Sequence, residues 1–188
     1  MPGFKIRRAA LKDLDVLVEH RNAMFDEYTH LTPEEHEVAD TSYPVWAREL
    51  MKQGLFHGYV VETAGGKVAA SGCVWLRQQQ PSRGSPASLV PYVMSIYTNP
   101  KFRRRGLASM IVEEAMAWSK KHGYRKMTLH ASLAGRKVYS QLGWKRTWEM
   151  EIRFDELRRS ARLTRGAPPR FSKPSPNATR RRRGPSLQ

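Results

Sequence analysis

The stretch Arg103-Arg104-Arg105-Gly106-Leu107-Ala108 decides the fold of this chain, because of the segments on each side of it. Residues 92–98 before it are β-branched and aromatic and end at Asn99-Pro100, which is typical of a strand. Residues 109–118 after it carry apolar side chains at helical spacing. The sequence therefore predicts a strand, a short basic loop and a helix in direct succession.

This arrangement is suited to binding a phosphate or pyrophosphate. The first turn of a helix has N–H groups without intrahelical partners, and they lie at the positive end of the helix dipole. Gly106 tolerates a positive φ and a close approach of backbone to ligand. The three arginines add positive charge at the same place, so we expect an anionic ligand there.

The chain before this stretch predicts one strand, two helices and two further strands. Residues 4–7 alternate as a strand, and a helix begins at Asp13. A second helix is expected over 43–51, and Pro33 suits a first helical turn ahead of it. Strands over 56–62 and 68–76 are joined by a glycine turn and followed by a loop over 78–88.

The chain after the long helix predicts a strand at 126–131, a short helix at 134–142 and a final alternating strand at 148–154. The predicted order is β-α-α-β-β-β-α-β-α-β. This order defines one mixed α/β domain over residues 1–157.

Composition separates this domain from its tail. The chain of 188 residues carries a formal charge of +16. Residues 158–188 contain ten basic residues, five prolines and no acid, which leaves +6 for the domain. Such a segment buries too little apolar surface to offset its ordering entropy, so we expect a disordered basic tail. No segment has the apolar length of a membrane span or a signal peptide, which predicts a cytoplasmic protein. The single cysteine, Cys73, is expected to be a buried thiol.

A second motif gives the domain a family resemblance. The segment Tyr139-Ser140-Gln141-Leu142-Gly143-Trp144 follows the long helix, and Arg103-x-x-Gly106-x-Ala108 precedes it. Together with the element order, these two motifs make residues 4–154 similar to the GNAT superfamily of acyl-CoA N-acyltransferases. The resemblance implies a mixed, mostly antiparallel sheet with a central splayed parallel strand pair, flanked by about four helices.

The resemblance also implies acetyl-CoA as co-substrate and no metal. The loop would hold the pyrophosphate, the strand that precedes it would pair with pantetheine, and the Tyr139 hydroxyl would protonate the departing thiolate. The position at which many members carry an asparagine is Ser132 in this chain, and Arg136 follows it. The cofactor-binding residues expected on this basis are Ile96, Tyr97, Thr98, Arg103, Arg104, Arg105, Gly106, Leu107, Ala108, Ser109, Ser132 and Arg136.

The general base and the acceptor are weakly encoded. Many members place a glutamate on the strand before the loop, but residues 89–98 contain no acid. An ordered water could remove the proton directly, and the candidate side chains are His130, His57, Asp26, Glu27 and His30. The acceptor pocket of the family lies at the first two helices, where Arg21, Phe25 and Tyr28 are the substrate candidates. Arg21 would suit a carboxylate, whereas nearby acids would favour a cationic amine.

The sequence favours an N-acetyltransferase that moves an acetyl group from acetyl-CoA to a small-molecule or peptide amine by direct attack in a ternary complex. Two alternatives stay open at this point: a basic nucleic-acid-associated protein, and a non-catalytic CoA-binding module of the same fold. The tail predicts nonspecific contacts with anions. A homodimer is compatible with the resemblance.

Overall fold

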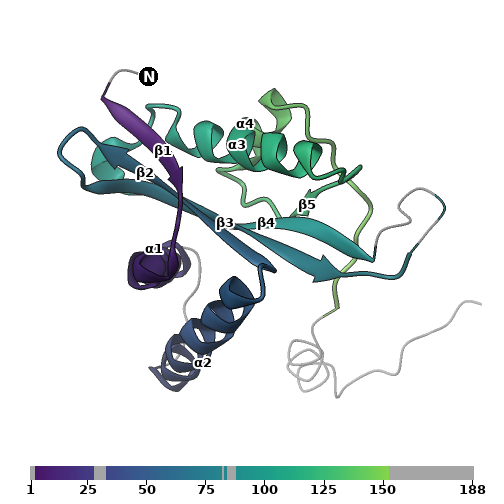
Figure 1. Ribbon diagram of the computed structural model, residues 1–188, viewed down its shortest axis with the longest axis horizontal. Coiled ribbons are helices and arrows are strands. Elements are labelled where there is room, and N and C mark those ends of the chain that lie inside the picture. The colour runs from purple at the N-terminus through teal and green to yellow at the C-terminus, as the bar shows by residue number, and fades with distance from the viewer. Residues whose placement is uncertain (1–2, 28–32, 82, 84–87, 153–188) are drawn as a thin grey trace, which may run out of the picture. The chain divides into compact units, whose positions relative to one another are not determined.

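The computed structural model describes residues 3–27, 33–81, 83 and 88–152. A five-stranded sheet in the order β1-β2-β3-β4-β5 forms its centre (Figure 1). The strands are β1 (Phe4–Arg8), β2 (Phe56–Thr63), β3 (Val68–Gln78), β4 (Leu89–Thr98) and β5 (Thr128–Leu129). The first four are antiparallel neighbours, whereas β4 and β5 are parallel. The predicted fold class is therefore confirmed, and the parallel pair lies at the β5 edge of the sheet.

Helices cover both faces of this sheet. The helices are α1 (Leu14–Asp26), α2 (Pro33–Lys52), α3 (Leu107–Lys121) and α4 (Arg136–Gln141), with short 3-10 turns η1 (Leu11–Asp13) and η2 (Pro100–Phe102). Figure 1 shows α1 and α2 on one face and α3 and α4 on the other. None of the helices in the described part of the chain combines the length and the apolar composition that crossing a bilayer requires.

The two faces carry separate apolar clusters, as strand alternation requires. On the α3 face, Val61 and Val93 of the sheet pack with Ile111. On the α1 and α2 face, Val60 and Cys73 pack with Leu17. Cys73 is buried as predicted, and this burial raises the pKa of its thiol to about 12.

Two predicted elements differ in length from the observed ones. The second helix is longer than the predicted 43–51 because the segment from Pro33 joins it, and Pro44 lies inside it without ending it. Its buried side chains Tyr43 and Ala47 show why the helix continues, since tertiary packing outweighs a local breaker. The strand predicted over 126–131 is limited to two residues, because β5 pairs with β4 only there.

The predicted final strand is wrong for the residues that are described. Residues 148–152 lie outside any strand, and Trp148 and Met150 are exposed. Alternation of apolar and polar residues indicates an extended segment with one apolar face, but a strand also needs a hydrogen-bonding partner along its edge. Residues 153 and 154, and the predicted tail over 158–188, lie outside the described residues. Residues 146–152 belong to a unit separate from the one that ends at Lys145.

Candidate functional site

The loop between β4 and α3 has the geometry of an anion cradle. Arg104 and Gly106 both adopt positive φ, at 59° and 73°. Gly106 is the N-cap of α3, and the first intrahelical bond runs from the Met110 N–H to the Gly106 carbonyl oxygen at 3.0 Å. The N–H groups of residues 107–109 therefore precede that bond and have no partner within the helix. Leu107, only 1% exposed, fixes this helix end in the core.

The arginines of the loop are held differently from one another. Arg103 Nε donates to the Thr98 carbonyl oxygen at 2.9 Å, and its guanidinium forms an ion pair with Glu27 directly after α1. Arg105 lies 6.0 Å from the ring centroids of both Phe4 and Phe102. Arg104 is exposed. Arg104 and Arg105 are thus better placed than Arg103 to meet an anion, and Glu27 is engaged by a cation.

β4 contains a bulge just before this loop. Ser95 has a φ of 54°, and the register of β3 against β4 shifts between Ser71 and Cys73. Gly72 faces the bulge, and a Cβ at this position would clash with Ile96 and with Ile111 of α3. The bulge redirects the end of β4, as such irregularities do near functional sites.

The two parallel strands separate immediately beyond their pairing. β4 pairs with β5 at Tyr92 and Val93, and β4 then continues for five more residues to Thr98. Residues 94–98 therefore present an edge on the β5 side that β5 does not occupy. The predicted contacts Ile96, Tyr97 and Thr98 lie on this edge, next to the loop.

The segment around α4 holds the predicted catalytic tyrosine. Tyr139 is half-buried, and its ring lies against Gly135, where a Cβ would approach it to 2.9 Å. The Trp144 ring centroid is 6.0 Å from that of Tyr139. Ser132 Oγ accepts a hydrogen bond from the Gly135 N–H at 3.2 Å, so this hydroxyl stabilises the turn that precedes α4. Arg136 is exposed at the first position of the helix.

On the opposite face of the sheet, the predicted substrate residues belong to an aromatic cluster. The Arg21 guanidinium lies 4.6 Å from the Phe25 ring centroid and 4.1 Å from that of Tyr43. Burial lowers the pKa of Arg21 and raises that of Tyr43. Sequence reasoning missed Tyr43 as a member of this site. Tyr28 and His30 lie outside the described residues.

A second residue missed from the sequence is His20. It is 5% exposed, its Nδ1 lies 2.9 Å from Ser71 Oγ, and its ring is 4.8 Å from that of Tyr97 on β4. Burial lowers its pKa, which favours the neutral imidazole. Its spacing of three residues from Leu17 on α1 was the available signal for a buried position.

The other histidine candidates lie in contrasting places. His57 is buried on β2 against the Trp118 ring of α3, with 4.3 Å between centroids, and its Nδ1 contacts the Arg8 guanidinium. One strand, β3, lies between β2 and β4 in the sheet, so His57 is away from the end of β4. His130 directly follows β5, and its Nδ1 lies 2.6 Å from Tyr92 Oη. Asp26 is exposed at the end of α1.

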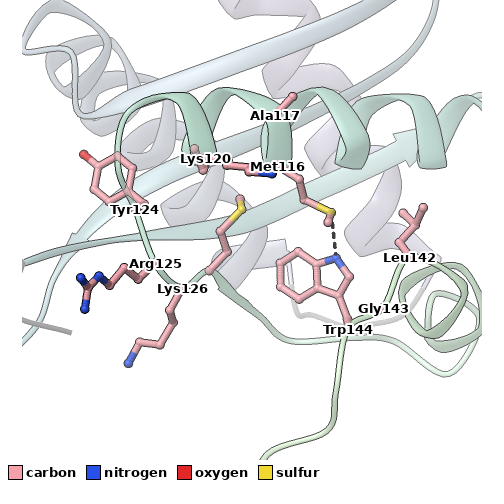
Figure 2. Close-up of a pocket in the computed structure, with 11 residues that line it drawn as sticks. Met116, Ala117, Lys120, Tyr124, Arg125, Lys126, Leu142, Gly143 and Trp144 are labelled. Atoms are coloured by element: carbon pink, nitrogen blue, oxygen red, sulfur yellow. Dashed lines mark hydrogen bonds between the residues drawn. The ribbon is translucent and has the colours of Figure 1, made fainter. Parts of the chain in front are cut away.

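A pocket of about 470 Å³ lies at the far end of α3 from the loop. Figure 2 shows the Trp144 indole in this pocket, with its Nε1–H donating to Met116 Sδ at 3.3 Å. Lys120, Arg125 and Lys126 also line it. The 15 residues of α3 span roughly 22 Å at 1.5 Å per residue, so this pocket is distinct from the anion cradle.

Three features are now in place: the bulge in β4, the loop with two residues at positive φ before the N-terminus of α3, and the splayed parallel pair of β4 and β5. Together they define an acyl-coenzyme A N-acyltransferase fold. The sequence matches the Acetyltransferase (GNAT) family over residues 21–144. The chain belongs to this family.

Solved structures give the same fold. A GCN5-related N-acetyltransferase from Ralstonia eutropha JMP134 is 25% identical, with a TM-score of 0.74 over 81% of this chain and 99% of that one. A predicted acetyltransferase from Clostridium acetobutylicum, solved with acetyl-CoA, is 22% identical, with a TM-score of 0.73 over 81% and 97%. Glucosamine-6-phosphate N-acetyltransferase from Arabidopsis thaliana is 23% identical, with a TM-score of 0.61 over 81% and 99%. Comparison with curated protein sequences gave no match.

Proposed function

We propose that this protein transfers an acetyl group from acetyl-CoA to a primary amine, by direct attack of the amine within a ternary complex. The observation that carries the proposal is the continuity between the open edge of β4 at residues 94–98 and the anion cradle that follows it. Coenzyme A has an amide-containing arm and a pyrophosphate in the same order. One ligand can therefore satisfy both features.

The cradle suits the pyrophosphate. The N–H groups of residues 107–109 point out of the start of α3, and the residues at positive φ turn the preceding backbone around the ligand. The positive charge of Arg103 is neutralised by its ion pair with Glu27, so Arg104 and Arg105 supply the positive charge for the pyrophosphate. Ala108 and Ser109 lie in the first helical turn, where small side chains leave room for phosphate oxygens.

The edge of β4 suits the pantetheine arm. The arm carries amide groups that can pair with backbone N–H and C=O groups, as an added strand would. Residues 94–98 span roughly 16 Å at about 3.3 Å per residue. With its pyrophosphate at the loop, the arm would run back along Thr98, Tyr97 and Ile96 and bring its thioester to the point where β4 and β5 meet.

Tyr139 is the proposed proton donor to the departing thiolate. It lies on α4, on the same side of the sheet as α3, and its ring is fixed by Gly135 and Trp144. A phenol is an adequate donor to a thiolate leaving group. Ser132 and Arg136, near the start of α4, are proposed to contact the coenzyme beside it.

Direct transfer is favoured over a covalent enzyme intermediate. The single cysteine, Cys73, is 1% exposed and has its pKa raised to about 12 by burial, so it is a poor nucleophile. The acceptor would instead bind on the α1 and α2 face, where Arg21 and Phe25 form a wall with Tyr43. Tyr28 remains part of this proposed wall.

Calorimetry with coenzyme A tests the proposal directly. We expect one site per chain with a Kd of tens of micromolar or below, and thiol release from acetyl-CoA when an amine is added. Binding without thiol release for any amine would favour the non-catalytic CoA-binding module. Deleting residues 158–188 separates the nucleic-acid alternative: the transferase keeps its turnover, whereas a protein that binds nucleic acid through its basic tail loses that binding.

A further inference from the structure

We infer that Tyr92 and His130 form the pair that removes the proton from the acceptor's ammonium group. The inference rests on the proposed function, because it concerns the amine that attacks acetyl-CoA. It also supplies a proton acceptor for the amine, since β4 contains no Asp or Glu that could act as the general base.

The pair stands where the parallel strands part. Tyr92 is in register with Thr128, and the next pair, Val93 with Leu129, is the last before β4 and β5 separate. His130 follows β5 directly. A pantetheine arm laid along residues 94–98 with its pyrophosphate at the loop must end against this last pair. The reactive carbonyl carbon is therefore brought next to Tyr92 and His130.

The pair also lies on the acceptor's side of the sheet. The Tyr92 ring packs edge-on against Trp75, with 6.4 Å between centroids, and Trp75 packs against Trp46 of α2 at 5.3 Å. This is the α1 and α2 face, whereas Tyr139 belongs to α4 on the opposite face (Figure 1). The group that accepts a proton from the nucleophile and the group that gives one to the thiolate are thus on opposite sides of the reacting carbon.

The geometry of the pair allows a proton relay. Tyr92 Oη and His130 Nδ1 are 2.6 Å apart, within reach of a hydrogen bond in which the phenol O–H donates to the imidazole. Tyr92 contacts the amine, and His130 acts through it as a positioning residue and proton acceptor. A further charged group, the Arg77 guanidinium of β3, lies 4.9 Å from the Tyr92 ring centroid.

The proton inventory balances. One N–H bond of the ammonium breaks as that proton passes to Tyr92 Oη, while the phenol's own proton passes to His130 Nδ1 and from there to water. The neutral amine then forms the C–N bond, and the C–S bond breaks. Tyr139 gives its proton to the thiolate and recovers one from water, while the nitrogen of the new amide loses its surplus proton to water. The products are the acetylated amine, free coenzyme A and one released proton.

The test follows thiol release at pH 6.5 to 9.5 with kanamycin, spermidine, glucosamine 6-phosphate and alanyl-glycine as acceptors, using whichever gives the wild type its highest rate. We expect Tyr92→Phe and His130→Gln to lower kcat/KM by about 10- to 100-fold at pH 7. The deficit should shrink to about threefold or less at pH 9.5, because solvent then supplies the neutral amine. The Kd for coenzyme A should stay within about twofold of wild type.

Matched controls are Tyr124→Phe and His122→Gln, which make the same chemical changes near the C-terminal end of α3 and should leave the rate unchanged. If either Tyr92→Phe or His130→Gln kept the wild-type rate at pH 7, this inference would be overturned, but the proposed function would stand. A deficit that is equal at every pH would also overturn this inference, since that is the signature of lost packing. No thiol release by the wild type with any of the four amines would overturn the proposed function and this inference together.

Discussion

Arg103, the first residue of the loop motif, is ion-paired with Glu27, the residue that follows α1. Arg103 Nε also donates to the Thr98 carbonyl oxygen at 2.9 Å, so one side chain connects the end of β4 to the end of α1. The two partners are 76 positions apart in the sequence. This contact fixes how the anion cradle sits against the proposed acceptor wall.

The ion pair leads to a prediction about charge at the cradle. In Glu27→Gln the bond from Arg103 to Thr98 can persist, but the guanidinium is no longer neutralised. We expect coenzyme A to bind about two- to fivefold more tightly at low salt, and the gain to fade as salt screens the freed charge. Calorimetry at roughly 50 mM and roughly 300 mM salt, on either side of physiological ionic strength, measures this change in affinity. Weaker binding at both would show that the ion pair positions the loop instead. Unfolding free energy should fall by about 1 kcal/mol or less, since both partners are partly exposed.

Gly106 gives a prediction about backbone geometry. Its φ of 73° is costly for any residue with a Cβ, so Gly106→Ala should destabilise the fold by roughly 1–2 kcal/mol. We also expect coenzyme A affinity to fall at least about tenfold, because relaxation toward negative φ re-aims the N–H groups at the start of α3.

Gly54→Ala is the matched control for this change. Gly54 has a φ of 69° and no atom within 4 Å of an added Cβ, and it lies just beyond α2. Gly54→Ala should lower the unfolding free energy measured in urea by a similar amount, with no change in coenzyme A affinity. Equal effects of the two variants on affinity would remove the specific role of the Gly106 backbone.

Tyr139 gives a prediction about catalysis. Removing its hydroxyl should lower kcat by about 10²-fold or more, while coenzyme A affinity changes little, because the ring still packs between Gly135 and Trp144. Steady-state kinetics of Tyr139→Phe beside calorimetry separates the two quantities. An unchanged kcat would assign the proton donor to another group.

Asp13 gives a prediction about acid stability. The Arg7 guanidinium, 2.8 Å away, and the Ala10 N–H hold the pKa of the Asp13 carboxyl at about 2, below its ordinary 3.8. A lowered folded-state pKa stabilises the fold above about pH 4, and the contribution is lost as pH falls toward 2. The lowered pKa of Asp13 contributes about 2 kcal/mol to the unfolding free energy at neutral pH.

Urea unfolding of Asp13→Asn between pH 7 and pH 2.5 measures this contribution, with the exposed Asp15→Asn as control. The gap between Asp13→Asn and wild type should narrow as pH falls, whereas Asp15→Asn should follow wild type throughout. A gap of constant size would mean that the amide disrupts packing rather than removing a charge.

The sequence determined those features that depend on neighbouring residues. Gly106 and the helix behind it are set by local backbone preferences, and Gly106 adopts the positive φ that a glycine tolerates. Strand and helix periodicities likewise predicted the α/β class and the order of the elements along the chain up to α4. The strand predicted over 148–154 is wrong at residues 148–152, because alternation specifies which face of a strand is buried but not which strand it pairs with.

Only the tertiary structure decided which distant side chains meet. Arg103 reaches Glu27, and Tyr92 reaches His130, because the register of β4 with β5 and the packing of α1 bring them together. The bulge at Ser95 then sets where the strands part. Such contacts depend on long-range pairing, for which a linear sequence carries no periodic signal. The loop proposed to bind coenzyme A could therefore be predicted from the residues alone, whereas the groups proposed to surround the amine required the fold.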